Sequence, residues 1–291
     1  MEKEITTTYI WQKYEKGIDY INKINLTAKT DKCHRMYNGD QWGGTKLGDV
    51  EPVQKNFIKP IVKYKVAVIH DNLYAANFSS QNYENREFQK AAKKYCELLN
   101  GYFRRLWEKD KLDFFGRRVT KDAAINGEGI IYINFDKEKN TPVHEIIKKV
   151  DVYYGNENDD NIQNQPYILI RKRMPVVNAR DFAISEGMSE EKTKFIVGDN
   201  DNFEESGEDA KIELDEMVTI VYKMYKKDDT VHYSIASRWC NITEEVDTGL
   251  TQYPIAHFVW EEKEGSAKRC SRRSIGQRLR SSPWQSISTA Q

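Results

Sequence analysis

The stretch Lys121–Asn134, KDAAINGEGIIYIN, marks the point at which the spacing of apolar residues changes along the chain. Before Gly127 the apolar residues recur every three or four positions, which is the spacing of an amphipathic helix. After Gly129 they recur every second position, as in a strand. Glycine adopts the left-handed conformation that ends many helices, so this pair is typical of a helix end. The sequence therefore predicts an α+β protein in which helices precede strands.

Helices are expected upstream of this point. Apolar residues at helical spacing occupy residues 9–24, 53–68, 84–107 and 112–125. A loop with Tyr37, Trp42 and a glycine pair is expected between the first two helices, because Asn-Gly and Gly-Gly steps favour turns. Residues 72–78 fit either a short strand or the end of the second helix.

Downstream, short strands alternate with turns and two short helices. Strands are predicted at 130–135, 143–150, 166–173, 218–226, 230–236 and around 255–260. The two helices are expected to begin after Pro175 and after Ser189. Asp228-Asp229 is expected at the tip of a hairpin. Residues 199–216 hold nine acidic residues and one lysine, and we interpret them as a solvated loop.

The charge of the chain is zero overall but unevenly distributed. It has 291 residues, with 45 basic and 45 acidic side chains. Residues 265–291 carry six basic residues and no acidic one, so the preceding 264 residues have a net charge of −6. A mildly acidic body argues against a protein that grips nucleic acid tightly, because such affinity comes mostly from basic side chains on phosphates.

Residues 265–291 differ from the rest in composition, because arginine outnumbers lysine five to one there and serine is frequent. They fit an arginine-rich arm that binds nucleic acid, a disordered basic tail, or a product of a reading frame that shifts near residues 266–268. The abrupt loss of acidic residues and the change from lysine to arginine favour the shifted frame.

No catalytic, cofactor-binding or metal-binding residue is predicted, and we expect that the chain is not an enzyme. Its four cysteines and five histidines do not form the paired spacings of metal sites. Gly43–Lys46 is too short for a phosphate-binding loop, and Asp199–Glu204 has Phe and Glu where a calcium loop needs a ligand and a glycine. His70-Asp71 is interpreted as a surface or strand-end pair. Basic clusters such as Arg171–Arg173 lie beside acidic residues and are interpreted as solvated faces or subunit contacts.

The N-terminus lacks the apolar run of a signal peptide, and no stretch approaches the ~20 apolar residues that span a bilayer. The cysteines are expected to be free thiols. These features predict a soluble protein of a cytoplasm, with no membrane partner.

Four stretches occur in an order that is shared with one family. They are Arg35–Trp42 (RMYNGDQW), Asn56–Val62 (NFIKPIV), Lys121–Gly129 (KDAAINGEG) and Tyr253–Glu261 (YPIAHFVWE). Together they resemble motifs of the portal proteins of tailed bacteriophages, also called head–tail connectors. Each motif alone is short, but the four follow the family's order over about 230 residues.

The resemblance implies a portal-like α+β fold with a helical wing and a small mixed α/β unit (residues 1–176). A partial stem with a short helix and the acidic loop (177–210) and a small β-rich clip (211–264) would follow, and then the basic tail (265–291). Tyr222, Tyr225 and Trp239 of the clip are expected to be core residues. Family members continue into a long segment after the Gly-Ser element that Gly265-Ser266 matches, so this chain is expected to be the truncated N-terminal part of a portal protein.

The resemblance also implies a role and partners. Portal proteins form a homo-oligomeric ring, usually a dodecamer, at one vertex of the capsid. The ring is the conduit for double-stranded DNA, docks the large subunit of the terminase, and joins head to tail through adaptor proteins. The chain would then be a structural virion protein that assembles in the host bacterial cytoplasm with capsid and scaffold proteins, and it would contact DNA non-specifically.

Two alternatives stay open from the sequence. One is a nucleic-acid-binding protein that uses the basic residues of 265–291. The other is a phosphoryl-transfer enzyme or nuclease that uses scattered carboxylates.

Overall fold

The computed structural model describes residues 8–43, 53–71, 77–79, 86–136, 140–159, 161–199 and 216–261. The basic tail, almost all of the acidic run and most of the uncertain segment 72–78 lie outside these residues. The fold is mixed α+β, as the sequence predicts. Within the described part, no helix combines the length and apolar character needed to cross a membrane.

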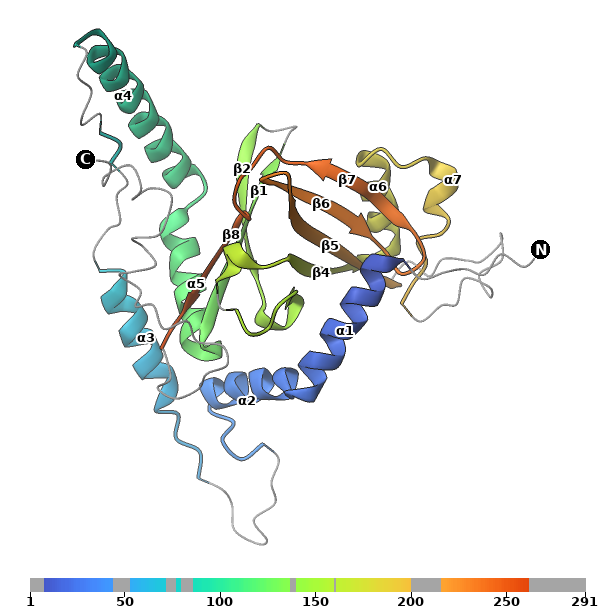
Figure 1. Cartoon of the computed structure of the whole chain (residues 1–291). Helices are drawn as coiled ribbons and strands as arrows, with labels where there is room; N and C mark the ends of the chain where they lie inside the picture. Colours follow the sequence, from blue (N-terminus) through green and yellow to red (C-terminus); the bar gives the residue numbers. More distant parts are fainter. Residues whose placement is uncertain are drawn as a thin grey trace, which may run out of the picture. The chain divides into compact units, whose positions relative to one another are not determined.

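The chain forms two compact units (Figure 1). We call residues 32–128 the helical unit, and Met1–Asp31 with Gly129–Gln291 the sheet unit. Strands from residues 211–264 share sheets with strands from residues 128–175, so contacts divide the chain differently from the four sequence segments. The assignment of those segments to wing, stem and clip stays a prediction.

The helical unit contains the end of α2 (Leu26–Asn38), α3 (Ile58–Ile69), α4 (Arg86–Lys109) and α5 (Leu112–Asn126). The last three match predicted helices. The sequence did not predict α2, which is polar on most of its surface and buries only Tyr37. Gly127 follows α5 with a φ of +87°, and its N–H donates to the carbonyl of Ala123. This left-handed end is the feature that the glycine pair predicts.

The sheet unit is built on a five-stranded antiparallel sheet in the order β3-β4-β5-β6-β7. Its strands are β3 (Val152–Tyr154), β4 (Tyr167–Pro175), β5 (Met217–Lys227), β6 (Thr230–Ala236) and β7 (Asn241–Asp247). A second sheet has the order β2-β1-β8, with β1 (Glu128–Asp136), β2 (Thr141–Ile147) and β8 (Ile255–Val259). The sequence did not predict β3, which has three residues, or β7, an edge strand that buries only Ile242.

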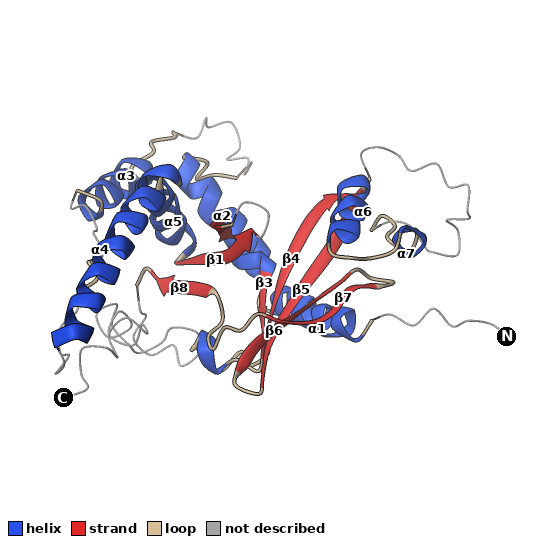
Figure 2. Cartoon of the chain, turned by 90° about the horizontal axis from the view of Figure 1, so that it is seen from above, coloured by secondary structure: helices blue, strands red, loops and turns tan. Residues whose placement is uncertain are grey.

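Helices cover both faces of the five-stranded sheet (Figure 2). On one face, α1 (Tyr9–Lys23) packs through Ile10 and Tyr14 on Leu169 of β4 and Val221 of β5. The other face packs on α6 (Val176–Ser185), and the short α7 (Glu190–Thr193) follows it. Because both faces are covered, five consecutive residues of β5 are buried, so its burial does not alternate.

The hairpin between β5 and β6 confirms a predicted turn. Asp228 and Asp229 have φ values of +50° and +63°, and Lys227 pairs with Thr230. Positive φ at both central residues is the geometry of the type I′ turn, whose twist matches that of the two strands.

Gly17 should be intolerant of a side chain, because a Cβ there would lie 2.6 Å from Cδ1 of the buried Tyr153 ring. We expect Gly17→Ala to lower the free energy of unfolding by about 1–3 kcal/mol, although alanine favours helices. Gly101→Ala in α4 is the matched control, since a Cβ there would meet no neighbouring atom within 4 Å. The free energy of unfolding of the Gly101→Ala variant should rise by about 0.5–1 kcal/mol.

Urea unfolding followed by tryptophan fluorescence and circular dichroism measures the free energy of unfolding of both variants. A Gly17→Ala protein as stable as the parent would contradict the packing of α1.

Candidate functional site

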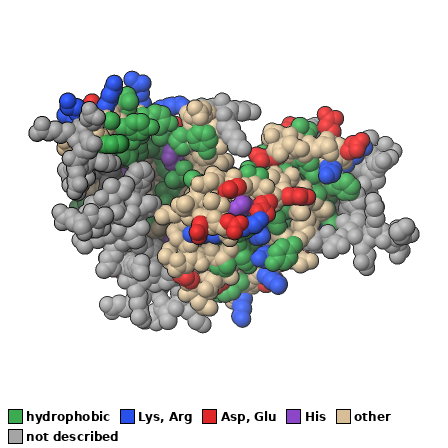
Figure 3. All heavy atoms as spheres, turned by 45° about the horizontal axis from the view of Figure 1, so that its top comes forward, with side chains coloured by type: hydrophobic (Ala, Val, Ile, Leu, Met, Phe, Trp, Pro, Cys, Tyr) green, Lys and Arg blue, Asp and Glu red, His purple; other side chains and the backbone are tan. Residues whose placement is uncertain are grey.

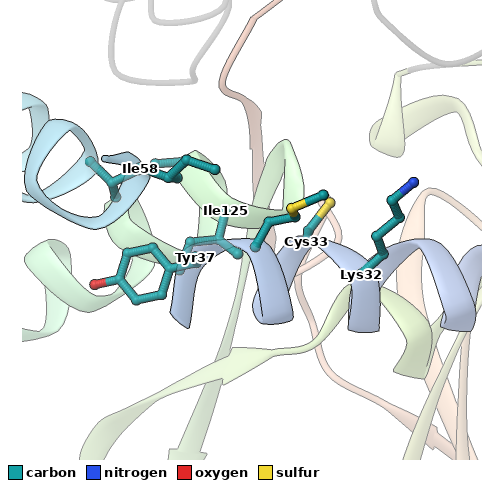
Figure 4. Close-up of a pocket in the computed structure, with 8 residues that line it drawn as sticks. Lys32, Cys33, Tyr37, Ile58 and Ile125 are labelled. Carbon is teal, nitrogen blue, oxygen red and sulfur yellow. The ribbon is translucent and has the colours of Figure 1, made fainter. Parts of the chain in front are cut away.

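Three of the four family-like stretches meet in the helical unit at a junction of α2, α3 and α5. A cavity of about 260 Å³ lies there (Figure 4). Its walls come from all three helices and are mostly apolar: Lys32, Cys33, Met36, Tyr37, Ile58, Val62, Ala124 and Ile125. We call this the α2–α3–α5 junction.

Tyr37 is the centre of the junction. Its side chain is 6% exposed. The Nζ atoms of Lys59 and Lys121 lie 5.9 and 5.2 Å from the centroid of its ring. An ammonium near the face of an aromatic ring is attracted by the ring's quadrupole. Tyr37 therefore holds one lysine from α3 and one from α5 at the end of α2.

Asn56 joins the end of α2 to the start of α3. Its Nδ2 donates to the carbonyl of Tyr37 at 2.9 Å, and its Oδ1 accepts from the N–H of Lys59 at 3.0 Å. The second bond satisfies a backbone donor in the first turn of α3. Gly39 lies against Asn56 with a φ of +90°, and a Cβ there would be 3.0 Å from Nδ2. Glycine is therefore favoured at position 39 for two reasons: its positive φ and the lack of room for a side chain beside Asn56.

Side chains of the following loop hold the approach to α3. Gln41 Nε2 donates to the carbonyl of Lys55, and Trp42 Nε1 donates to the carbonyl of Val53 at 3.2 Å. At the other end of α3, His70 Nε2 and Thr120 Oγ1 of α5 are 2.8 Å apart. The contacts of the first two stretches therefore hold the end of α2 against the start of α3. The third stretch lies on α5, which packs beside α3.

The fourth stretch has a comparable role in the sheet unit. The Tyr253 hydroxyl donates to the carbonyl of Gln165 at 2.8 Å, and its backbone N–H donates to Gln163 Oε1 at 2.8 Å. Burial raises the pKa of Tyr253 to about 12. The carbonyl of Pro254 accepts from the N–H of Ile133 of β1 at 2.9 Å. These bonds position β8 beside β1.

The helical unit exposes many large apolar side chains (Figure 3). We call two groups of them the apolar faces of α3 and α4. The α3 face comprises Ile58, Ile61, Tyr64, Val68 and Ile69, and the α4 face comprises Phe88, Tyr95, Leu98, Leu99 and Tyr102. Tyr64 is 72% exposed and Tyr95 is 68% exposed. Large exposed apolar side chains that gather on one helix are typical of contact sites for other proteins or membranes.

Asp199 and the basic cluster Arg171–Arg173 have structural contacts, whereas most of the stretches Gly43–Lys46 and Asp199–Glu204 lie outside the described residues. Asp199 accepts hydrogen bonds from the N–H and hydroxyl of Thr219 and forms an ion pair with Arg173 at 3.4 Å. Arg171 pairs with Asp151, and Lys172 pairs with Glu145. Among the described residues, no group of three or more His, Cys, Asp or Glu side chains is arranged to hold a metal ion. Tyr222 lies in the core, as expected, while Tyr225 and Trp239 are partly buried.

We expect Asn56→Ala to lower the free energy of unfolding of the helical unit by about 1–3 kcal/mol, because it removes two hydrogen bonds, one of which satisfies a backbone donor in the first turn of α3. The Asn56→Asp variant distinguishes the contributions of the two hydrogen bonds to stability. It keeps an acceptor for the N–H of Lys59 and loses the donor to Tyr37. Urea unfolding followed by circular dichroism should place Asn56→Asp between the parent and Asn56→Ala. Equal stability of all three proteins would show that Asn56 does not hold the junction.

The stability of the helical unit should fall below about pH 6.5. Burial, followed by the charge of Arg117, lowers the pKa of His70 from its usual value near 6.5. The unfolded chain then binds a proton more readily than the folded chain, so the stabilisation is complete above pH 6.5 and is lost as the pH falls toward the folded pKa. His70→Gln removes this titration and should flatten the profile of unfolding midpoint between pH 7 and 5. Parallel profiles for the parent and the His70→Gln protein would show that His70 does not cause the pH dependence of stability.

No protein-family model and no curated protein matches this chain.

Proposed function

We propose that this chain is a structural subunit of the portal ring of a tailed bacteriophage and corresponds to the N-terminal part of that protein. In this role it conducts DNA at a capsid vertex, docks the packaging terminase and connects head to tail. The order of the four family-like stretches first suggests this function. The observation that carries it is the convergence of three of them at the α2–α3–α5 junction.

That convergence matters because short motifs are frequent by chance. Trp42 ends the first stretch and Lys121 begins the third, and these two residues are 79 positions apart in the chain. Residues of the three stretches nevertheless line one cavity and share the contacts of Tyr37 and Asn56. Motifs that depend on one another in space support a common origin better than motifs that lie apart.

The apolar faces of α3 and α4 support a role within an assembly. A subunit of a ring buries part of its surface against its neighbours, and such surfaces are enriched in aromatic and large aliphatic residues. Both faces carry tyrosines and leucines or isoleucines that are more than one third exposed.

The charge of the body supports the role as a conduit. Its net charge of −6 over residues 1–264 gives little attraction for phosphates. A channel that bound DNA through many ion pairs would oppose movement of the DNA, whereas weak attraction lets it slide.

The assembly state of the purified chain tests the proposal. Because the chain is equated with an N-terminal part, we would also test the products in which each of the other two reading frames continues after Gly265. Light scattering and negative-stain electron microscopy should show closed rings with a central opening for at least one product, with a mass that is a multiple of the subunit mass. Monomers from all three products would contradict the proposal.

Substitutions on the apolar faces make the test specific. Tyr64→Glu with Tyr95→Glu places charges on two side chains that are 72% and 68% exposed, so the fold should persist while assembly is lost. Val143→Glu with Leu250→Glu in the sheet unit is the matched control, since these residues are 43% and 46% exposed and lie outside both faces. Rings that form equally well with the tyrosine substitutions would exclude these faces as subunit contacts.

A further inference from the structure

Lysine and tyrosine side chains alternate across α1, β4 and β5 of the sheet unit. Lys13 Nζ lies 4.0 Å from the ring centroid of Tyr167 and 4.7 Å from that of Tyr9. Lys223 Nζ lies 5.6 Å from the centroid of Tyr9 and 4.2 Å from that of Tyr225. We call these five residues the Lys–Tyr row. Its order is Tyr167, Lys13, Tyr9, Lys223, Tyr225, so one ring lies near both ammonium groups.

The fold determines this arrangement. Tyr167 and Tyr225 are paired across β4 and β5, and Lys223 lies two residues before Tyr225, so all three side chains share one face of the sheet. The helix α1 packs on that same face through its buried residues. Tyr9 and Lys13 are four residues apart on α1 and therefore lie on one side of it, next to the three strand residues.

The two ammonium groups have no carboxylate partner within the described part of the chain. The acidic group that acts on Lys223 is Glu245, whose Oε1 already bonds Lys227 Nζ at 2.8 Å and lies 3.1 Å from His232 Nδ1. Burial, followed by the charge of Lys13, lowers the pKa of Lys223. A hydrogen bond with Lys13 and the charges of the nearby lysines lower the pKa of Tyr9. The row therefore holds two ammonium groups that no described carboxylate neutralises by an ion pair.

These two ammonium groups contrast with the net charge of the unit that carries them. The sheet unit has 33 acidic and 27 basic residues, yet the row holds two ammonium groups near one ring without ion pairing. Two like charges held together repel each other, and this cost is removed when an anion binds between them. The start of α1 adds to the attraction, because Tyr9 is its first residue and helix N-termini favour anions.

We propose that the Lys–Tyr row binds phosphate groups, and that its ligand is the sugar–phosphate backbone of a nucleic acid. The site is open, since Tyr9 is 63% exposed, and an open site cannot enclose a small anion. A polyanion that places successive phosphates on Lys13 and Lys223 suits it better. The lysines cover the tyrosine ring faces, so bases do not stack there and binding is independent of sequence. This site does not depend on the portal assignment.

Fluorescence anisotropy of the full chain with a labelled 20-base-pair duplex and with its single strand tests the proposal. Lys13→Gln with Lys223→Gln should lower the affinity about tenfold at low salt and reduce the slope of log affinity against log salt by about two, because two phosphate contacts are lost. Lys148→Gln with Lys194→Gln removes the same charge from exposed positions of the same unit and should change the affinity less than about twofold. Equal affinities of the row variant and this control would overturn the proposal.

Location and folding need their own readouts, because the basic residues of 265–291 are also present in every variant. The ring signals of Tyr9, Tyr167 and Tyr225 in nuclear magnetic resonance spectra, assigned with Tyr→Phe variants, should shift during titration with the duplex. Lys13→Arg with Lys223→Arg keeps both charges and should restore binding, and circular dichroism should show that each variant is folded. Failure of the arginine variant to restore binding would assign the loss to altered packing and overturn the proposal.

Two further probes distinguish other anions. Inorganic phosphate should shift the same signals only weakly. If phosphate shifts them while the duplex does not, the row is a small-anion site and the nucleic-acid ligand is wrong. A synthetic peptide of residues 199–216, which carries nine acidic residues, represents an acidic protein segment. If this peptide binds the row more tightly than the duplex does, the row is a protein contact and the proposal is overturned.

Discussion

The pairing of β5 with β4 and β6 is the constraint on which the sheet unit depends. Val218–Tyr222 are buried consecutively, so side chains from one strand must be covered on both faces at once. The α1 helix covers one face, with Val221 in its contact, and the layer that includes α6 covers the other, with Ile220 and Tyr222. Loss of the β4–β5 register would therefore expose both cores, and it would also separate Tyr167 from Tyr225.

The sequence predicts those parts of the fold whose apolar pattern is local. The hairpin tip at Asp228-Asp229 and the helix end at Gly127 follow from turn chemistry within a few residues, whereas the type I′ geometry is seen only in the structure. The α2 helix and β7 are missed because they are mostly polar, and tertiary pairing determines them. The sharing of one sheet by β4 and β5 is not readable either, because more than 40 residues separate these strands.

The same distinction applies to the candidate sites. The stretches around Tyr37 and Asn56 are recognisable as sequence patterns, but their meeting with α5 depends on long-range packing. The Lys–Tyr row carries even less local signal. Lys13 and Lys223 are 210 positions apart, and nothing in either neighbourhood marks them as a pair. The net charge of the sheet unit argues against an anion-binding site, since the unit is acidic as a whole.

The motif residues act through packing and hydrogen bonds, and this bears on the kind of function they serve. Tyr37, Asn56, Gly39 and Tyr253 set the ends of helices and strands, and in the described chain their contacts are with backbone and neighbouring side chains. Residues that carry catalysis instead need accessible reactive atoms and supporting partners. The contacts of these four residues instead determine local structure, in line with the structural role proposed above. In that role, the exposed apolar faces of α3 and α4 would be the surfaces that contact neighbouring subunits.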